Sequence, residues 1–176
     1  MKKMILLGSF ALSLLACTEQ NKTEETRIEV KTQGDGYTVN ETDNVKMVKA
    51  LNEAALNYDT AALRGFYSGT ADTIHDNLNN ITLDQNLQML AALQKSGIKA
   101  TVASYPAIWE TINNKPNAKG QTNFVIAYMI VNLSRGTKTS SVLFNQVCAI
   151  KDGKVVEEWD VYDNTPFNEM RKWFFF

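Results

Sequence analysis

A change of pattern at Gly97 is the feature that most limits how this 176-residue chain can fold. Before Gly97, apolar residues recur three or four positions apart, which is the spacing of one helix face. After it come long runs rich in β-branched and aromatic residues, which favour strands. Helices and strands in separate blocks are typical of α+β domains. The chain is therefore predicted to be an α+β protein, with three N-terminal helices packed on one face of a curved, largely antiparallel sheet.

The predicted helices have recognisable ends. Asp59 is placed to cap a short second helix. Thr82 followed by Gln85 is a capping-box pattern that opens a third helix, and Gly97 stands where a helix C-cap belongs. The first helix is indicated by one apolar face, made by Met47, Leu51, Ala54, Ala55 and Tyr58.

Strands are predicted for most of the chain after Gly97, with one short strand before it, within residues 70–76. Pro106 cannot donate a ladder hydrogen bond, so it predicts an edge or a bulge in the first long strand. Asp152-Gly153 is a hairpin turn signal between the last two strands. The long strands are expected over residues 98–112, 122–133, 139–150 and 155–162.

The first 16 residues are predicted to be a targeting signal. Two lysines precede an apolar stretch that is too short to span a bilayer as a stable helix. The stretch ends in Leu-Leu-Ala-Cys at Cys17, which resembles the lipobox of bacterial lipoproteins. The resemblance implies cleavage before Cys17, lipidation of Cys17 and anchoring in the cell envelope, with the outer membrane favoured. An ordinary secretory signal with an incidental Cys is the alternative.

The remaining chain divides into three parts. Residues 17–42 are polar and are predicted to be a flexible tether. Residues 43–167 are predicted to form the folded domain, and residues 168–176 an aromatic tail that ends in Trp-Phe-Phe-Phe. An exposed apolar tail is a contact surface or a liability. It is open to three interpretations: folding back on the domain, pairing with a second subunit, or dipping into the membrane.

Charge and cysteine content exclude several classes of function. A formal net charge of −1 gives no electrostatic basis for binding nucleic acid. One His and two Cys exclude a multi-ligand His/Cys zinc site or an iron–sulfur site, so no metal and no cofactor are expected. Cys148 lies in an apolar run and is expected to be buried and unreactive.

One segment carries a family resemblance. Residues 153–161 read Gly-Lys-Val-Val-Glu-Glu-Trp-Asp-Val, which is similar to the Gly-Lys-Ile-Val-Glu-His-Trp-Asp-Val stretch of SnoaL-like polyketide cyclases. These proteins belong to the nuclear transport factor 2-like superfamily. The order of helices and strands over residues 43–167 also resembles that fold. The resemblance implies a cone-shaped, mixed sheet, closed by helices around a pocket.

The resemblance also implies site residues. Asp160 matches the carboxylate that acts as acid/base in the cyclases, and His75 matches a strand histidine of the family. Glu158 stands where the family has a second histidine, which places two carboxylates on one strand face. The alternatives are a solvent-facing Asp160 and a His75 that only caps a turn or bonds within the helix–sheet seam.

Several aromatic side chains are expected to line the pocket or to pack in the core. Tyr58 is predicted near a helix end, where its hydroxyl would hang into the mouth of the cone. Trp109, Tyr128 and Tyr162 are predicted ligand-binding residues on strands, although large aromatic residues in strands usually serve packing. The sheet is also expected to be able to pair with a second copy of the chain.

Two functions remain open at this stage. The favoured one is a lipid-anchored envelope protein that binds a small apolar ligand or acts as an accessory module. The alternative is an acid/base enzyme of the isomerase, cyclase or hydrolase type, acting on a small carbonyl compound with Asp160 and His75. Fold class alone does not choose between them. The geometric observation that would distinguish them is whether His75 and Asp160 point into one cavity, and we expect that they do.

Overall fold

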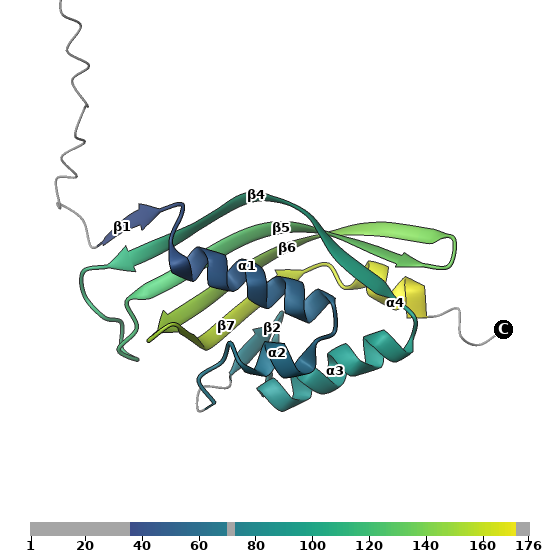
Figure 1. The fold of residues 1–176 in the computed structure, drawn as a ribbon, viewed down its shortest axis with the longest axis horizontal. Coiled ribbons are helices and arrows are strands. Elements are labelled where there is room, and N and C mark those ends of the chain that lie inside the picture. The colour runs from purple at the N-terminus through teal and green to yellow at the C-terminus, as the bar shows by residue number, and fades with distance from the viewer. Residues whose placement is uncertain (1–35, 70–72, 172–176) are drawn as a thin grey trace, which may run out of the picture. The chain divides into compact units, whose positions relative to one another are not determined.

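The computed structural model describes residues 36–69 and 73–171, which lie in one compact unit of the chain. Their elements follow the predicted order of helices before long strands (Figure 1). The elements are β1 (Gly36–Val39), α1 (Asp43–Leu56), α2 (Thr60–Arg64), β2 (Ile74–Asp76), β3 (Asn79–Ile81), α3 (Leu83–Lys95), β4 (Lys99–Asn113), β5 (Asn123–Arg135), β6 (Lys138–Lys151), β7 (Lys154–Tyr162) and α4 (Thr165–Arg171).

The strands form one curved, open sheet in the order β1-β4-β5-β6-β7-β2-β3. All neighbouring pairs are antiparallel except β2 and β7, which run parallel, so the sheet is mixed. Helices α1, α2 and α3 cover one face, called here the inner face, and the opposite one is the outer face (Figure 1). The predicted α+β architecture is confirmed.

The helix ends match their sequence signals. Thr42 caps α1 by accepting a hydrogen bond from the Val45 amide, and Asp59 caps α2 by accepting one from the Ala62 amide. The capping box between Thr82 and Gln85 is formed in full, since each residue's side chain accepts from the other's amide. Capping satisfies backbone donors that a helix terminus otherwise leaves unpaired.

The inner face carries the hydrophobic core in two clusters. The first lies under the helices and joins Val48 and Leu51 of α1 to Val125 and Val155 of the sheet. The second lies at the other end of β5 and β6 and includes Leu133, Val142 and Met170. Between these clusters the inner face is not filled by apolar side chains alone, and the candidate site lies there.

A β-bulge in β7 places Val155 and Glu158 on the same face of the sheet. Ile150 pairs with Val155, whereas its neighbour Ala149 pairs with Glu157, so β7 carries one extra residue at this point. Regular alternation would place Val155 opposite to Glu158. Because of the bulge, both point to the inner face.

Other expectations differ from the structure at the ends of elements. Residues 36–39, assigned to the tether, form β1 and pair with β4. Residues 168–171, assigned to the tail, continue α4, whose Met170 is buried.

Pro106 does lie where the β4–β5 register shifts, as predicted. Cys17 and Trp173–Phe176 lie outside the described residues. Among the described residues, no helix has both the length and the apolar character needed to cross a membrane.

Candidate functional site

A cavity of about 220 Å³ lies between the helices and the inner face of the sheet. Its walls from α1 and α3 are mostly apolar, and its polar residues come mainly from the sheet strands β2, β6 and β7 and from α4. The residues that line it include Leu51, Asn52, Tyr58, Leu63, Tyr67, Ile74, Asp76, Asn86, Leu90, Leu93, Met129, Phe144, Gln146, Glu158, Asp160, Tyr162, Asn164, Phe167 and Asn168.

Strand register gathers the polar side chains. Asp76 of β2, Asp160 of β7 and Gln146 of β6 are successive Cα partners, so they form one row across three strands. Glu158 lies two residues before Asp160 on the same strand, in the next row of the same face. Three carboxylates and one amide therefore converge on one end of the cavity.

Glu158 is buried and fully engaged by neutral donors. Its side chain is 3% exposed. The Tyr67 hydroxyl donates to one of its carboxylate oxygens, and Gln146 Nε2 donates to the other at 2.8 Å. Burial, reinforced by the charge of Glu158, raises the pKa of Tyr67 well above its ordinary value, which keeps this hydroxyl a donor.

Asp160 lies beside this group without a comparable set of partners. Its Oδ1 atom is shielded from solvent and accepts no hydrogen bond, and the same holds for Gln146 Oε1. Burial is the main cause that raises the pKa of Asp160 well above its ordinary value, and the negative charge of Glu158 adds to it. The direction agrees with the expectation for a carboxyl in a cavity. A raised pKa of this kind is typical of carboxyl groups that exchange protons.

Of the other predicted pocket residues, Tyr58 and Tyr162 line the cavity. The Tyr58 hydroxyl does not hang into the cavity, because it donates to the Ile98 carbonyl oxygen at 2.7 Å. Tyr162 stacks on Phe144 and meets the edge of Phe167 from α4. These three rings close the end of the cavity near α4.

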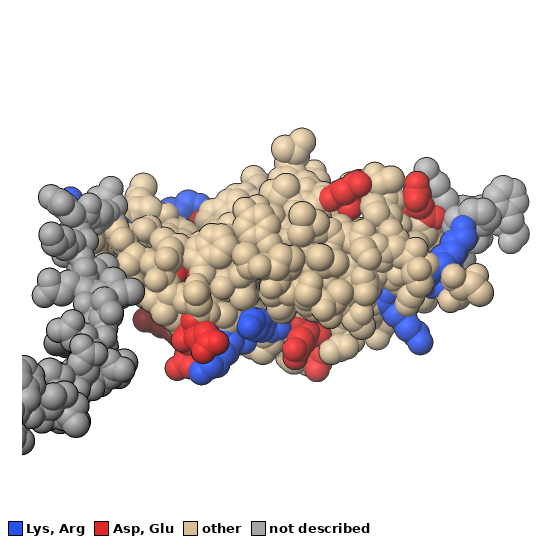
Figure 2. All heavy atoms as spheres, turned by 90° about the horizontal axis from the view of Figure 1, so that it is seen from above, with Lys and Arg blue, Asp and Glu red and all other residues tan. Residues whose placement is uncertain are grey.

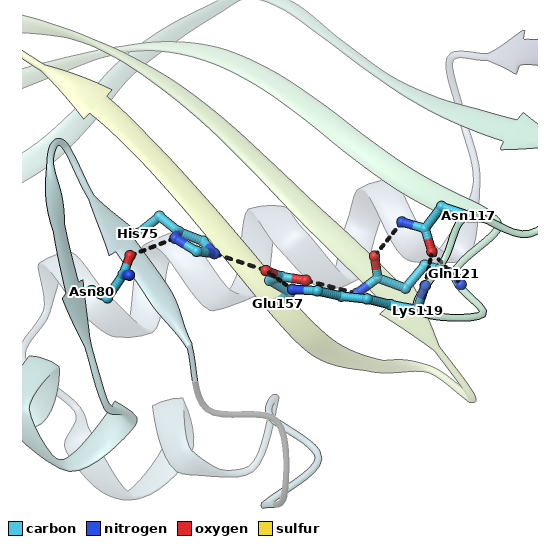
Figure 3. A network of polar contacts seen from close by, with 6 residues as sticks. All are labelled: His75, Asn80, Asn117, Lys119, Gln121 and Glu157. Carbon is cyan, nitrogen blue, oxygen red and sulfur yellow. Dashed lines mark hydrogen bonds and ion pairs between the residues drawn. The ribbon is translucent and has the colours of Figure 1, made fainter.

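His75 is not in the cavity. Because Ile74 and Asp76 face inward, His75 points to the outer face, where its ring stacks on Trp159 with centroids 5.1 Å apart. Its Nε2 atom lies 2.7 Å from Glu157 Oε1, and its Nδ1 atom lies 2.7 Å from Asn80 Oδ1 (Figure 3). The expected common cavity for His75 and Asp160 is therefore wrong, since the sheet separates the two side chains.

Glu157 is the centre of a polar network on the outer face (Figure 3). Lys119 Nζ donates to it at 2.6 Å and Gln121 Nε2 at 3.0 Å, both from the β4–β5 connection. Burial acts to raise the pKa of Glu157, but the hydrogen bonds from Lys119, His75 and Gln121 outweigh it and lower the pKa to about 2. The network is a satisfied ion cluster that joins the β4–β5 connection and β2 to β7.

Trp109 and Tyr128 also lie away from the cavity. Trp109 pairs with Ile126 in the outer-face row that continues through Val147 and Trp159 to His75. Its ring stacks on Tyr128 with centroids 6.1 Å apart. Their predicted contact with a ligand in this cavity is not supported, because strand alternation turns both rings outward.

Three important residues were not predicted. Tyr67, Asp76 and Gln146 all line the cavity. Gln146 had a readable signal, because it interrupts the apolar inward-facing positions between Val142 and Ile150 on its strand. Asp76 could have been predicted, because it lies two positions after the apolar Ile74 on the same short strand and therefore shares its face. Tyr67 had no sequence signal, because it lies in an irregular segment whose position depends on tertiary contacts. Cys148, predicted to be inert, is buried, and burial raises the pKa of its thiol.

The described lining carries no Lys, Arg or His. Within residues 36–69 and 73–171, no group of three or more His, Cys, Asp or Glu side chains is arranged to hold a metal ion. The site thus presents acidic groups and neutral amides and hydroxyls against an apolar wall. Chemically, it can accept hydrogen bonds, hold a proton on Asp160 and exclude water from a small ligand.

The fold resembles those of solved enzymes and related proteins. AclR of Streptomyces galilaeus, provisionally described as a hydroxylase, is 16% identical, with a TM-score of 0.54 over 73% of this chain and 96% of that one. An epoxide hydrolase of M. tuberculosis described as LEH-like is 16% identical, with a TM-score of 0.52 over 73% and 89%. A provisionally assigned polyketide cyclase of Xanthomonas campestris pv. campestris is 13% identical, with a TM-score of 0.54 over 73% and 96%.

At these identities the likeness concerns the fold, which supports only a ligand-binding or enzymatic domain of unspecified chemistry. Neither a family model nor a curated protein sequence matches the chain. The structural likeness agrees with the resemblance carried by residues 153–161, and both lead to the same architecture. The described domain therefore has the nuclear transport factor 2-like fold.

Proposed function

We propose that the domain binds a small, largely apolar molecule in the cavity beneath α1 and α3. The observation that carries this proposal is the combination of an apolar wall with shielded polar atoms that have no partner, Asp160 Oδ1 and Gln146 Oε1. Leaving a buried acceptor unpaired costs about 1–3 kcal/mol. A site that serves packing alone gains nothing from this cost, whereas a ligand-binding site uses such atoms to orient its ligand.

The test fills the cavity from the helix side. Ala55 of α1 lines the cavity, and Ala50 of the same helix is exposed. The Cys17→Ser form, which the cell cannot lipidate, is purified and native mass spectrometry records any ligand that it retains. We expect Ala55→Phe to abolish the retained mass and Ala50→Phe to keep it. Retention of the same mass by Ala55→Phe would show that the cavity is not the binding site.

Acid/base catalysis is a second candidate, favoured by the raised pKa of Asp160. In this function Asp160 exchanges a proton with a small carbonyl compound, while Tyr67 and Gln146 hold Glu158 in place. His75 takes no part, because it lies on the outer face. Exchange of the α-protons of 2-cyclohexen-1-one with D₂O, followed by NMR, tests it. We expect acceleration by the parent protein and by His75→Gln, but none by Asp160→Asn.

We further propose that lipid on Cys17 anchors the domain in the cell envelope, with the outer membrane favoured. The supporting observation is the Leu-Leu-Ala-Cys sequence at the end of the apolar signal. Membrane fractionation is the measurement. Cys17→Ser is expected to move the protein to the soluble fraction, and a variant that stays in the membrane fraction would exclude the lipid anchor.

The outer face of the sheet is proposed to pair with a second copy of the chain. Its central row runs from Trp109 to Trp159, and Val161 of the same face is 60% exposed. Figure 2 looks down on the β4 side of the domain and shows a broad uncharged centre with charged side chains toward the edges. Analytical ultracentrifugation should show a dimer that Val161→Glu weakens. Leu78→Glu, at a fully exposed turn, should leave it intact.

A further inference from the structure

We propose that the ligand of this cavity is an organic amine, whose ammonium group binds Asp160 with Asp76 and Glu158 around it and whose apolar body lies against α1 and α3. The proposal rests on the proposed binding function and specifies its ligand class. It comes from three observations: the sign of the charge in the cavity, the kind of atom left without a partner, and the shape of the walls.

The described cavity lining is acidic without compensation. Asp76 and Asp160 are Cα partners on adjacent strands, and Glu158 lies in the next row of the same face. No Lys, Arg or His is among the described residues that line the cavity. Buried ionised groups are stable only when paired with an opposite charge or with good hydrogen bonds. A cationic ligand would supply the charge that the lining does not.

The two side-chain atoms of the cavity that have no partner are both acceptors. Asp160 Oδ1 and Gln146 Oε1 are shielded from solvent, and Gln146 as a whole is 2% exposed. Two donors of the lining, the Tyr67 hydroxyl and Gln146 Nε2, already donate to Glu158. A ligand that brings hydrogen atoms to this end of the cavity would satisfy the two unpaired acceptors. An ammonium group has three such hydrogen atoms and accepts no hydrogen bond, which suits a site made of acceptors.

A neutral donor such as an alcohol satisfies the geometry less well than a cation. An alcohol brings no charge to balance the acidic lining, whereas an ammonium group is attracted by all three acidic side chains and favours the ionised form of Asp160. Glu157, on the other face of the same strand, shows the arrangement that a buried carboxylate adopts in this protein, because it is bound by Lys119. The described lining of the cavity supplies the carboxylates of such a pair but no cation.

An organic cation fits the site better than a metal ion. No set of three or more metal-ligating side chains is arranged to hold one in the described parts of the chain. The volume of about 220 Å³ exceeds the roughly 150 Å³ of a cavity that holds benzene, so one ring with a short chain can enter. Phe144, Tyr162 and Phe167 offer aromatic surface near the acidic end, and such rings also attract ammonium groups.

The test compares three probes with one carbon skeleton: 3-phenylpropylamine, 3-phenylpropan-1-ol and 3-phenylpropanoate. Isothermal titration calorimetry at pH 7 uses the full chain with Cys17→Ser. We expect the amine to bind at least tenfold more tightly than the alcohol, and the carboxylate not to bind. Asp160→Asn should bring the amine and the alcohol to within about twofold of each other. Asp43→Asn, at an exposed position on α1, should leave the tenfold preference intact.

Each outcome has a defined meaning. Equal or tighter binding of the alcohol by the parent protein would overturn the amine proposal and leave the cavity as a binding site. Absence of binding by all three probes would overturn the amine proposal, and the Ala55→Phe experiment then judges the cavity separately. If Asp160→Asn does not fold, Asp76→Asn replaces it. A tenfold preference that survives in the folded variant tested would place the amine elsewhere and overturn the proposal.

Discussion

Glu157 and Glu158 are neighbours in the chain, yet their surroundings on the two faces of β7 are opposite in character. Glu157 meets Lys119, His75 and Gln121, and these donors lower its pKa to about 2. Glu158 meets only neutral donors, and the Asp160 beside it has a pKa raised well above the ordinary value by burial. Both residues are glutamates on the same strand, so neither residue type nor the strand explains why their surroundings differ. The difference comes from what each face packs against.

The comparison separates a structural ion cluster from a candidate binding site. On the outer face, every charge of the network has a partner within reach, and the network holds the β4–β5 connection on the sheet. On the inner face, the carboxylates share a space with unpaired acceptors. Removing charge should therefore destabilise the protein on one face and stabilise it on the other.

The largest effect is expected from Glu157→Gln. It removes the charge that Lys119 and His75 share, and the loss of charged hydrogen bonds should reduce the free energy of unfolding at pH 7 by about 2 kcal/mol. Because the pKa of Glu157 is lowered from 4.5 to about 2 in the folded protein, this contribution is complete above pH 4.5 and is lost as the pH falls toward 2. Urea unfolding at several pH values measures both.

The control for this variant is Asp43→Asn, which removes an exposed i,i+3 ion pair with Lys46. Exposed pairs contribute little, so no measurable change is expected. If Glu157→Gln lost no more stability than Asp43→Asn, the outer-face network would have no structural role.

Asp160→Asn should have a smaller effect of the opposite sign, an increase in stability of about 1 kcal/mol at pH 7 in the ligand-free protein. The pKa of Asp160 is raised above its ordinary value of 3.8, so ionisation opposes folding. The gain should be absent below pH 3.8 and should grow as the pH rises above it. Thermal unfolding across this pH range is the measurement, and a loss of stability at pH 7 would mean that Asp160 is paired in the folded state.

Lys119→Met should have the smallest effect. Its side chain is 63% exposed, so solvent weakens the ion pair with Glu157, and we expect a loss of about 0.5 kcal/mol at pH 7. His75 and Gln121 still hold the carboxylate. Combining Lys119→Met with Glu157→Gln in a double-mutant cycle would reveal the coupling, and strictly additive losses would show that the two side chains do not interact.

Local rules predicted much of the fold. The capping signals at Asp59 and Thr82 and the Asp152-Gly153 turn depend on neighbours in the sequence, and all three form as expected. Strand β1 was missed because four residues, Gly-Tyr-Thr-Val, are too few to show a periodic signal. Helix α4 was missed because its place depends on tertiary packing of Phe167 and Met170.

The site was predicted only in part, for a geometric reason. Strand alternation correctly placed Glu158, Asp160 and Tyr162 on one face with a cavity. His75 was misplaced because its match came from a family pattern, while the parallel pairing that sets its direction, His75 with Trp159, joins segments more than 80 residues apart. The prediction for Trp109 was wrong for a similar reason. The register is irregular around Pro106, so the sequence alone does not show which face of the sheet Trp109 lies on.

The bulge beside Val156 has a consequence for how this strand can change over evolution. Deleting the extra residue would restore plain alternation from Val155 onward and keep Glu158 and Asp160 pointing inward. A deletion between Glu158 and Asp160 would instead exchange the aspartate with its outward-facing neighbour. Lineages can therefore lose the extra residue at the bulge while conserving the site, whereas loss of Trp159 would turn Asp160 away from the cavity.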